Sequence, residues 1–480
     1  MSVRKSVFWS VTGQFFSIAT ALGTSIIIAR FLTPHEMGIY AVGFATLGAL
    51  QVFTAFDLAT YIVRAKVLEP DTLAAAFTVN AALLVGLAFL TFLGSYAAAR
   101  LLDEPAVAHV LQFLTIGLLI SIFEFRPVAM LRREMRFRLI SLITLGKTIA
   151  SSVTAVMFVT SGASFMSLAY GNVAYAAFGA LAFNLVAREH AGLRFSIKDW
   201  RAMTTFGLQM MSVSGLANLV GRISDILLGK MLGLASLGLY SRASTTASLL
   251  FHNVYGAATQ VVFVKLAEDY RQTGILRHTF LRGIQMLTAV MWPLLIGLAV
   301  LSQPVILLMF GSNWVPAAIP LSLLLIAQFI VLGFGMNWEL FVLREETARQ
   351  IRIEVLRATI GLALFAIGCA ISLTAAAASR IIEALIALLL YHPHVNRLAG
   401  TTVQDLTRIY GQSVLLTLVA ITPVLVLMLW NGWSAETPWS SILPAILLGI
   451  GLWLGTLKLI AHPLHDELSV MVGRLRRKHL

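Results

Sequence analysis

The chain has 480 residues, of which 58% are hydrophobic and only 12% are charged. A soluble domain carries roughly 25% charged residues, so this composition excludes a soluble globule and predicts an all-α polytopic membrane protein. A net charge of +13 suggests nucleic-acid binding in a soluble protein. Here most basic residues lie in loops that set membrane topology, so we expect no nucleic-acid partner.

The hydropathy pattern predicts about 14 transmembrane helices. The basic start at Arg4 and Lys5 leads directly into an apolar span without a small-residue cleavage site, which is typical of a membrane helix and not of a signal peptide. Turns at Pro34, Pro70 and Pro105 separate the first spans. The predicted spans, in chain order, are about 7–31, 38–63, 73–98, 107–125, 139–160, 163–186, 204–232, 237–264, 284–301, 317–342, 358–373, 375–391, 413–430 and 439–460.

The basic residues predict the orientation of these spans. An even number of spans places both termini on one side of the membrane, and all but seven of the 35 Lys and Arg residues lie on that side. By the positive-inside rule this side is cytoplasmic. The seven others are Arg30, Arg100 and Lys230 near the opposite surface, and Lys147, Arg222, Arg242 and Arg380 within helices.

Two turns of the chain are similar at a constant offset of 200 residues. Gly38 and Tyr40, after the first span, match Gly238 and Tyr240, after the seventh. A weaker match, offset by 211 residues, relates Pro105 to Pro316. Six helices per repeat is an even number, so the pattern predicts two repeats with the same orientation, which is typical of transporters.

The repeat leads to a predicted division of the chain into lobes and connecting segments. The segment between the lobes is polar, and its aromatic residues suggest a short amphipathic helix on the membrane surface. We expect an N-terminal six-helix lobe at 1–187, a cytoplasmic linker at 188–203, a second six-helix lobe at 204–392, helices thirteen and fourteen at 393–462 and a basic cytoplasmic tail at 463–480.

Motifs for catalysis are missing from the sequence. No Walker A loop is present, because Ser141 stands where the first glycine would precede Gly146 and Lys147, and no His-Glu-x-x-His spacing occurs. Cys369 is the single cysteine, which excludes an internal disulfide and a multi-cysteine metal site. We therefore expect no catalytic residue, no metal and no cofactor, and do not expect an enzyme.

Charged residues within the predicted spans are the candidate site. Arg222 and Asp225, and likewise Arg380 and Glu383, are three residues apart, so each pair shares a helix face. Each such charge costs roughly 2.5–3.5 kcal/mol at a helix centre, which makes a functional role the default hypothesis. Two interpretations stay open: the pairs are internal struts, or they line a hydrated cavity and bind an anionic headgroup. Arginine suits phosphate, because its planar fork donates two hydrogen bonds.

Three further polar residues are weaker candidates. Lys147 either lines the cavity or extends to the cytoplasmic interface, while Gln14 and Arg242 are possible lining residues. The tryptophans near predicted span ends are interpreted as interfacial anchors. They are Trp200, Trp314, Trp430, Trp433 and Trp439.

Three motifs in order carry a family resemblance. They are Ala29-Arg-Phe-Leu-Thr-Pro34 with Gly38 and Tyr40, Asp225 to Gly229 with the run Leu237 to Ala243, and Phe310-Gly311 with Trp314. Over about residues 5–400 the chain resembles the polysaccharide transporter branch of the multidrug/oligosaccharidyl-lipid/polysaccharide flippases. The resemblance implies two parallel six-helix lobes in a V, plus two C-terminal helices.

The resemblance also implies a function. Such flippases move undecaprenyl-pyrophosphate-linked oligosaccharide units across the bacterial inner membrane for exopolysaccharide, capsule or O-antigen assembly. Expected partners are the lipid-linked oligosaccharide, membrane lipids, and a polysaccharide polymerase with its chain-length machinery. The cavity role would fall on Arg222, Asp225, Arg380 and Glu383.

Three alternatives remain at this point. A cation-coupled multidrug exporter of the same fold would have an acidic, aromatic cavity, whereas the charges here come as basic and acidic pairs. A flippase for the lipid-linked peptidoglycan precursor is the second alternative. A membrane-embedded glycosyltransferase would need a large acidic outer loop, and the longest predicted outer segment, about 302–316, contains no acid.

Overall fold

The structure is a computed structural model of the chain. It describes residues 3–52, 56–65, 68–190, 192, 194–198 and 200–469. The side chains of 3–15, 209–218, 250, 252–254, 257–258 and 261 lie outside this description. Within the described residues every regular element is a helix and there is no strand, which confirms the all-α class.

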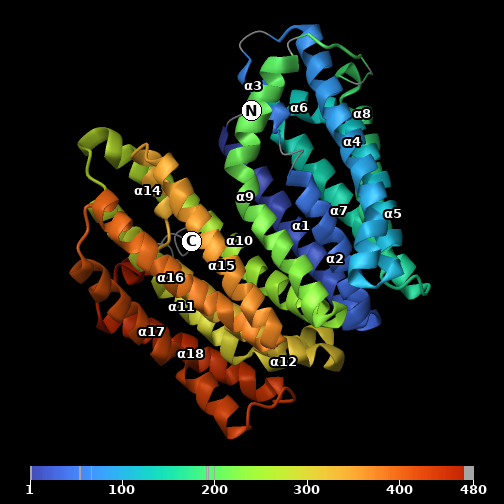
Figure 1. Cartoon of the computed structure of the whole chain (residues 1–480). Helices are drawn as coiled ribbons and strands as arrows, with labels where there is room; N and C mark the ends of the chain where they lie inside the picture. The colour runs from blue at the N-terminus through green and yellow to red at the C-terminus, as the bar shows by residue number, and fades with distance from the viewer. Residues whose placement is uncertain are drawn as a thin grey trace, which may run out of the picture. The chain divides into compact units, whose positions relative to one another are not determined.

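The chain divides into two compact units, Met1–Gly238 and Leu239–Leu480. Figure 1 shows their helices coloured along the chain. The first unit contains α1 (Val3–Phe31), α2 (Pro34–Gln51), α3 (Leu58–Arg64), α4 (Pro70–Leu102), α5 (Pro105–Ser121), η2 (Ile122–Glu124), α6 (Phe125–Arg133), α7 (Phe137–Thr160), α8 (Met166–Val186), η3 (Arg188–His190) and α9 (Trp200–Leu232). Helix α10 (Leu234–Thr273) begins in this unit and continues into the second.

The second unit continues from α10 with eight further elements. They are α11 (Arg277–Val300), α12 (Ser302–Phe310), η4 (Ser312–Ala317), α13 (Ala318–Leu332), α14 (Asn337–Leu343), α15 (Thr347–Ile371), α16 (Leu373–Ala399), α17 (Val403–Trp430) and α18 (Trp439–Leu459).

Ten helical segments of the described chain are long and apolar enough to cross a membrane. They correspond to the third to sixth and the ninth to fourteenth predicted spans, which confirms a multi-pass membrane protein. The other four predicted spans fall on α1, α2 with α3, α9 and α10. In the part of α1 whose side chains are described, Phe16–Phe31 is an apolar stretch. The count of fourteen spans stays a prediction.

Several predicted boundaries differ from the structure. The second predicted span is interrupted before α3, where Asp57 adopts a left-handed conformation with φ 40°. The tenth is interrupted before α14, where Met336 has φ 58°. The expected outer loop at 302–316 contains α12 and η4, and α10 continues to Thr273. Hydropathy detects the apolar part of a helix, whereas backbone hydrogen bonding continues past it into charged sequence.

Local sequence accounts for several helix starts. Thr33 forms a capping box with Glu36, and Pro34 occupies the first turn of α2, where a missing N–H has no cost. Pro70 and Pro105 open α4 and α5 in the same way. The turns expected at these prolines are therefore confirmed.

The predicted surface helix between the lobes is not formed in the described residues. The described residues between η3 and α9, which are 192 and 194–198, form no helix. Polar contacts hold this segment on the first unit: Lys198 Nζ lies 2.8 Å from Glu69 Oε2, and Ser196 N donates to Thr78 Oγ1 at 3.0 Å. The hydrogen bond and charge of Lys198 lower the pKa of Glu69. Because this segment has no periodic apolar face, it forms these polar contacts and not an amphipathic helix.

Helices α17 and α18, red in Figure 1, pack on one another, and α17 packs on α11. Thr288 and Ser413 share a hydrogen bond of 2.8 Å, and Gln285 donates to Gln412 at 3.1 Å. From α18, Trp453 Nε1 donates to the carbonyl of Ala289 at 3.0 Å. Inside a lipid bilayer the hydrophobic effect does not drive apolar helices to associate, so such polar contacts help to hold them together.

The two similar turns cross at a pair of glycines inside the first unit. A Cβ on Gly38 would run into the carbonyl oxygen of Leu234, and a Cβ on Gly238 would run into the carbonyl oxygen of Pro34. The partners are reciprocal at the same offset of 200, as in a two-fold contact. This reciprocity supports the sequence repeat and explains its glycines, because only glycine permits the two backbones to approach so closely.

We predict that Gly38→Ala and Gly238→Ala each destabilise the protein by about 1–3 kcal/mol, because the methyl group meets backbone and not a movable side chain. The double variant should cost less than the sum, since separating the helices once relieves both clashes. The midpoints of thermal unfolding in detergent measure these losses of stability. Gly23→Ala is the control, because no atom lies within 4 Å of its added Cβ. Equal unfolding midpoints for Gly38→Ala and Gly23→Ala would contradict the crossing.

Candidate substrate-binding site

Four alternating charges form a partly buried network between α15 and α16 of the second unit. Glu383 accepts from Arg357 Nη1 at 2.5 Å and from Arg380 Nη1 at 2.7 Å. Arg357 also pairs with Glu354, which accepts from the hydroxyl of Tyr391 at 2.9 Å. The side chains of Glu383 and Arg380 are only 11% and 17% exposed. Two arginines and two glutamates thus balance in charge within the unit.

Aromatic side chains fix Arg380 in this network. Its guanidinium lies 4.2 Å from the ring centroid of Phe365, and its Nε donates to Tyr240 OH at 3.4 Å. The added Cβ of a residue other than glycine at 361 would meet the Glu383 carboxyl group, so Gly361 provides the space for that carboxylate. The arginine is therefore held by one carboxylate, one hydroxyl and one aromatic face.

The structure pairs Arg380 with Glu383, as the spacing predicted, and adds two residues that sequence reasoning missed. The eleventh predicted span begins at 358 and so leaves Arg357 just outside it, whereas α15 begins ten residues before Arg357, at Thr347. The sequence does contain a signal for this second pair, because Glu354 and Arg357 have the same three-residue spacing as Arg380 and Glu383.

Arg222 contacts an aromatic ring of α2 in the first unit. Its guanidinium lies 5.0 Å from the ring centroid of Phe44. An added Cβ at Gly48 would lie 2.6 Å from Arg222 Nε, so this glycine provides space for the arginine. Asp225 is half-buried one turn further along α9. Gln14 lies in α1, and its side chain is outside the described residues.

Lys147 is buried in an ion pair and does not extend to the membrane surface. Its Nζ lies 2.5 Å from Glu124 Oε2, and the two side chains are 10% and 13% exposed. The ammonium also lies 4.2 Å from the ring centroid of Tyr175. The interpretation of Lys147 as an interfacial side chain is wrong, because the partner carboxylate lies on a neighbouring element of the same unit.

Trp314 is a core residue and not an interfacial anchor. It is fully buried, with 0% exposed, whereas Trp430 is 89% exposed. The guanidinium of Arg242 lies 4.8 Å from the ring centroid of Phe310 and 5.1 Å from that of Trp314. Arg242 is itself 3% exposed, so these rings enclose its charge inside the second unit.

One group of possible metal ligands lies among the described residues. Ligand atoms of Glu134, Glu189 and His190 lie within 4.8 Å of one another. Arg136 Nη1 is 3.6 Å from Glu134 and 3.5 Å from Glu189. The arginine already supplies positive charge to both carboxylates, so these contacts account for the cluster as a surface ion-pair network.

We predict that Lys147→Ala costs about 3–5 kcal/mol of stability, because it leaves the Glu124 carboxylate buried without compensation. The double variant Lys147→Met with Glu124→Gln should be more stable than Lys147→Ala, since no charge remains buried. Unfolding midpoints in detergent compare them. The exposed pair of Lys265 and Glu268 provides the control, and Lys265→Ala should change little. A double variant as unstable as the single one would disprove the buried pair.

The fold defines a class of protein. Over 95% of this chain and 99% of the other, the structure superposes on that of the lipid II flippase MurJ, with a TM-score of 0.76 and 15% identical residues. A multidrug resistance MATE family transporter gives a TM-score of 0.58 over 84% of this chain and 97% of its own, with 15% identity. The chain has the fold of these membrane transporters.

The sequence comparisons identify the family. Residues 27–319 match the family described as polysaccharide biosynthesis protein, and the chain belongs to this family. The succinoglycan biosynthesis transport protein ExoT of Rhizobium meliloti (strain 1021) is 26% identical over 69% of this chain and 67% of its own. The lipopolysaccharide biosynthesis protein WzxC of Escherichia coli (strain K12) is 23% identical over 65% of each chain. The chain thus spans about two thirds of these relatives.

Proposed function

We propose that this protein is a flippase that moves undecaprenyl-pyrophosphate-linked oligosaccharide units across the bacterial inner membrane for exopolysaccharide, capsule or O-antigen assembly. Membership of a polysaccharide biosynthesis family and a transporter fold support this proposal. The observation that carries it at the level of residues is the partly buried arginine network of α15 and α16. A polymerase and its chain-length machinery would then extend the translocated unit.

Arg380 is the residue we assign to the pyrophosphate. Its present carboxylate partner, Glu383, also holds Arg357, so Glu383 keeps one arginine when a phosphate takes the other. Phosphate offers the same bidentate acceptor geometry as carboxylate and more charge. Glu383 therefore keeps a cationic partner after the exchange, which lowers the cost of binding an anion at this depth.

We also propose Arg222 of α9, whose guanidinium lies 5.0 Å from the ring centroid of Phe44, as a cationic residue of the transport path.

We predict that Arg380→Gln abolishes surface polysaccharide production in cells, while Glu383→Gln retains most of it. A phosphate ligand must be cationic, whereas the carboxylate only holds it in place at rest. The double variant should behave as Arg380→Gln. Polymer yield is measured against the amount of folded protein in the membrane. If the double variant restores the polymer lost in Arg380→Gln, the pair is an internal strut and the assignment fails.

The proposed orientation has both termini in the cytoplasm, and fusions to alkaline phosphatase test it. The enzyme folds only outside the cytoplasm, because it needs disulfides. Fusions after Asp103 or Gly162 should be active, and fusions after Glu134 or Glu346 inactive. The reverse pattern would invert the topology, and activity at all four positions would disprove the alternation of spans.

A further inference from the structure

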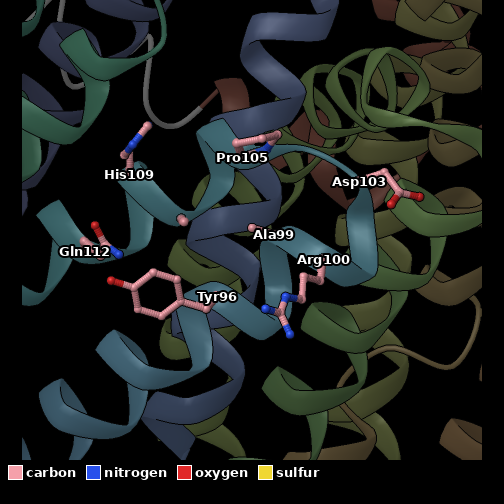
Figure 2. Close-up of a pocket in the computed structure, with 8 residues that line it drawn as sticks. Tyr96, Ala99, Arg100, Asp103, Pro105, His109 and Gln112 are labelled. Atoms are coloured by element: carbon pink, nitrogen blue, oxygen red, sulfur yellow. The ribbon is translucent and has the colours of Figure 1, made fainter.

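A pocket of about 600 Å³ opens in the first unit where α4 ends and α5 begins. Figure 2 shows polar side chains from both helices around it. Tyr96 and Arg100 come from α4, and His109 and Gln112 come from α5. The charges in the spans discussed above are not among its lining residues.

The position of the pocket puts it at a membrane surface. One candidate span, Pro70–Leu102, ends beside it, and the next, Pro105–Arg133, begins there. Below it, α4 exposes a run of large apolar side chains. Phe89, Leu90 and Leu93 are 61%, 58% and 51% exposed. A polar pocket above an apolar helix surface matches the order of headgroup and acyl chains in a phospholipid.

The charges around the pocket leave one cation available. Lys230 lies 3.9 Å from Asp103, and His35 lies 3.6 Å from Glu104, so the two acids at this corner each have a basic neighbour. In the part of the chain that the structure describes, no carboxylate lies within ion-pair distance of Arg100. The Arg100 guanidinium is exposed at the pocket and can accept an anionic ligand.

The corresponding corner of the second repeat has no such composition. The match of Pro105 to Pro316 aligns Ala99 with Phe310 and Asp103 with Trp314. Those two aromatic side chains are buried around Arg242 in the second unit. In the first repeat the small side chain of Ala99 lines open space instead. The pocket is therefore a feature of one repeat and not a consequence of the shared turn.

We propose that this pocket binds the phosphate group of an anionic phospholipid at the membrane surface. Arg100 would supply the paired N–H donors, and Tyr96 and His109 would supply further donors. Gln112 already donates to Ser95 Oγ at 3.2 Å, which orients its amide beside the pocket. The acyl chains would lie along the exposed apolar residues of α4. Basic pockets between membrane helices are typical sites for such headgroups.

Native mass spectrometry of the purified full chain with phosphatidylglycerol or phosphatidylcholine tests the proposal. We expect selective binding of phosphatidylglycerol. Its affinity should fall about five-fold in Arg100→Gln, because one basic residue at a membrane surface contributes about this much to the binding of an anionic lipid. Ala99→Phe should also weaken it, since the ring fills the pocket as Phe310 does in the second repeat. Arg30→Gln is the matched control: it removes a basic residue of the same predicted surface outside the pocket and should leave binding unchanged.

Three results would overturn the proposal. Both lipids carry a phosphate group, but only phosphatidylglycerol has a net negative charge. Equal affinity for the two lipids would therefore show that the pocket does not select an anionic headgroup. Unchanged binding in both Arg100→Gln and Ala99→Phe would place the lipid elsewhere. Displacement of phosphatidylglycerol by millimolar inorganic phosphate would identify a free anion, and not a lipid, as the ligand. Unfolding midpoints equal to that of the unmodified protein confirm that the variants are folded.

Discussion

Charge compensation within the membrane-spanning helices is the constraint on which this structure depends. A carboxylate or a guanidinium loses its hydration inside the bundle, so each must find an opposite charge close by, and a cation can also use an aromatic face. The chain uses both solutions. Glu383 bridges two arginines, Lys147 is paired with Glu124, and Arg242 lies against Phe310 and Trp314.

These arrangements differ in how readily an anion from outside can enter them. The pair of Lys147 and Glu124 has one cation for one carboxylate, so losing either partner leaves a buried charge. The α15–α16 network has two cations for two carboxylates, but Glu383 contacts both arginines and stays paired with Arg357 when Arg380 moves to a phosphate. This difference singles out Arg380 among the buried basic residues as the substrate ligand in our proposal.

Sequence reasoning predicted the fold class and the contact between Arg380 and Glu383. The three-residue spacing of Arg380 and Glu383 predicts their contact, because side chains three residues apart on a helix lie on one face. The repeat was visible in Gly38 and Gly238, although the backbone crossing that requires them was not. A composition of 58% hydrophobic residues was sufficient for the class of protein.

Several contacts that sequence reasoning missed join different elements. Glu124 and Lys147 are brought together by packing, and no periodic pattern links η2 to α7. Trp314 shows a second limit: an aromatic residue near a span end has the same pattern whether it faces lipid or the core. Arg357 was misplaced because hydropathy ends a helix at its first charges, while α15 begins at Thr347.

Translocation by the purified protein in liposomes is the most direct measurement of the central claim. A lipid-linked oligosaccharide is placed in both leaflets, and an added glycosidase that cannot cross the membrane reports which sugars reach the outer leaflet. If the protein is a flippase, the enzyme digests the inner pool as well, and Arg380→Gln protein leaves that pool intact. Digestion limited to the outer leaflet in liposomes that contain folded, unmodified protein would contradict the account.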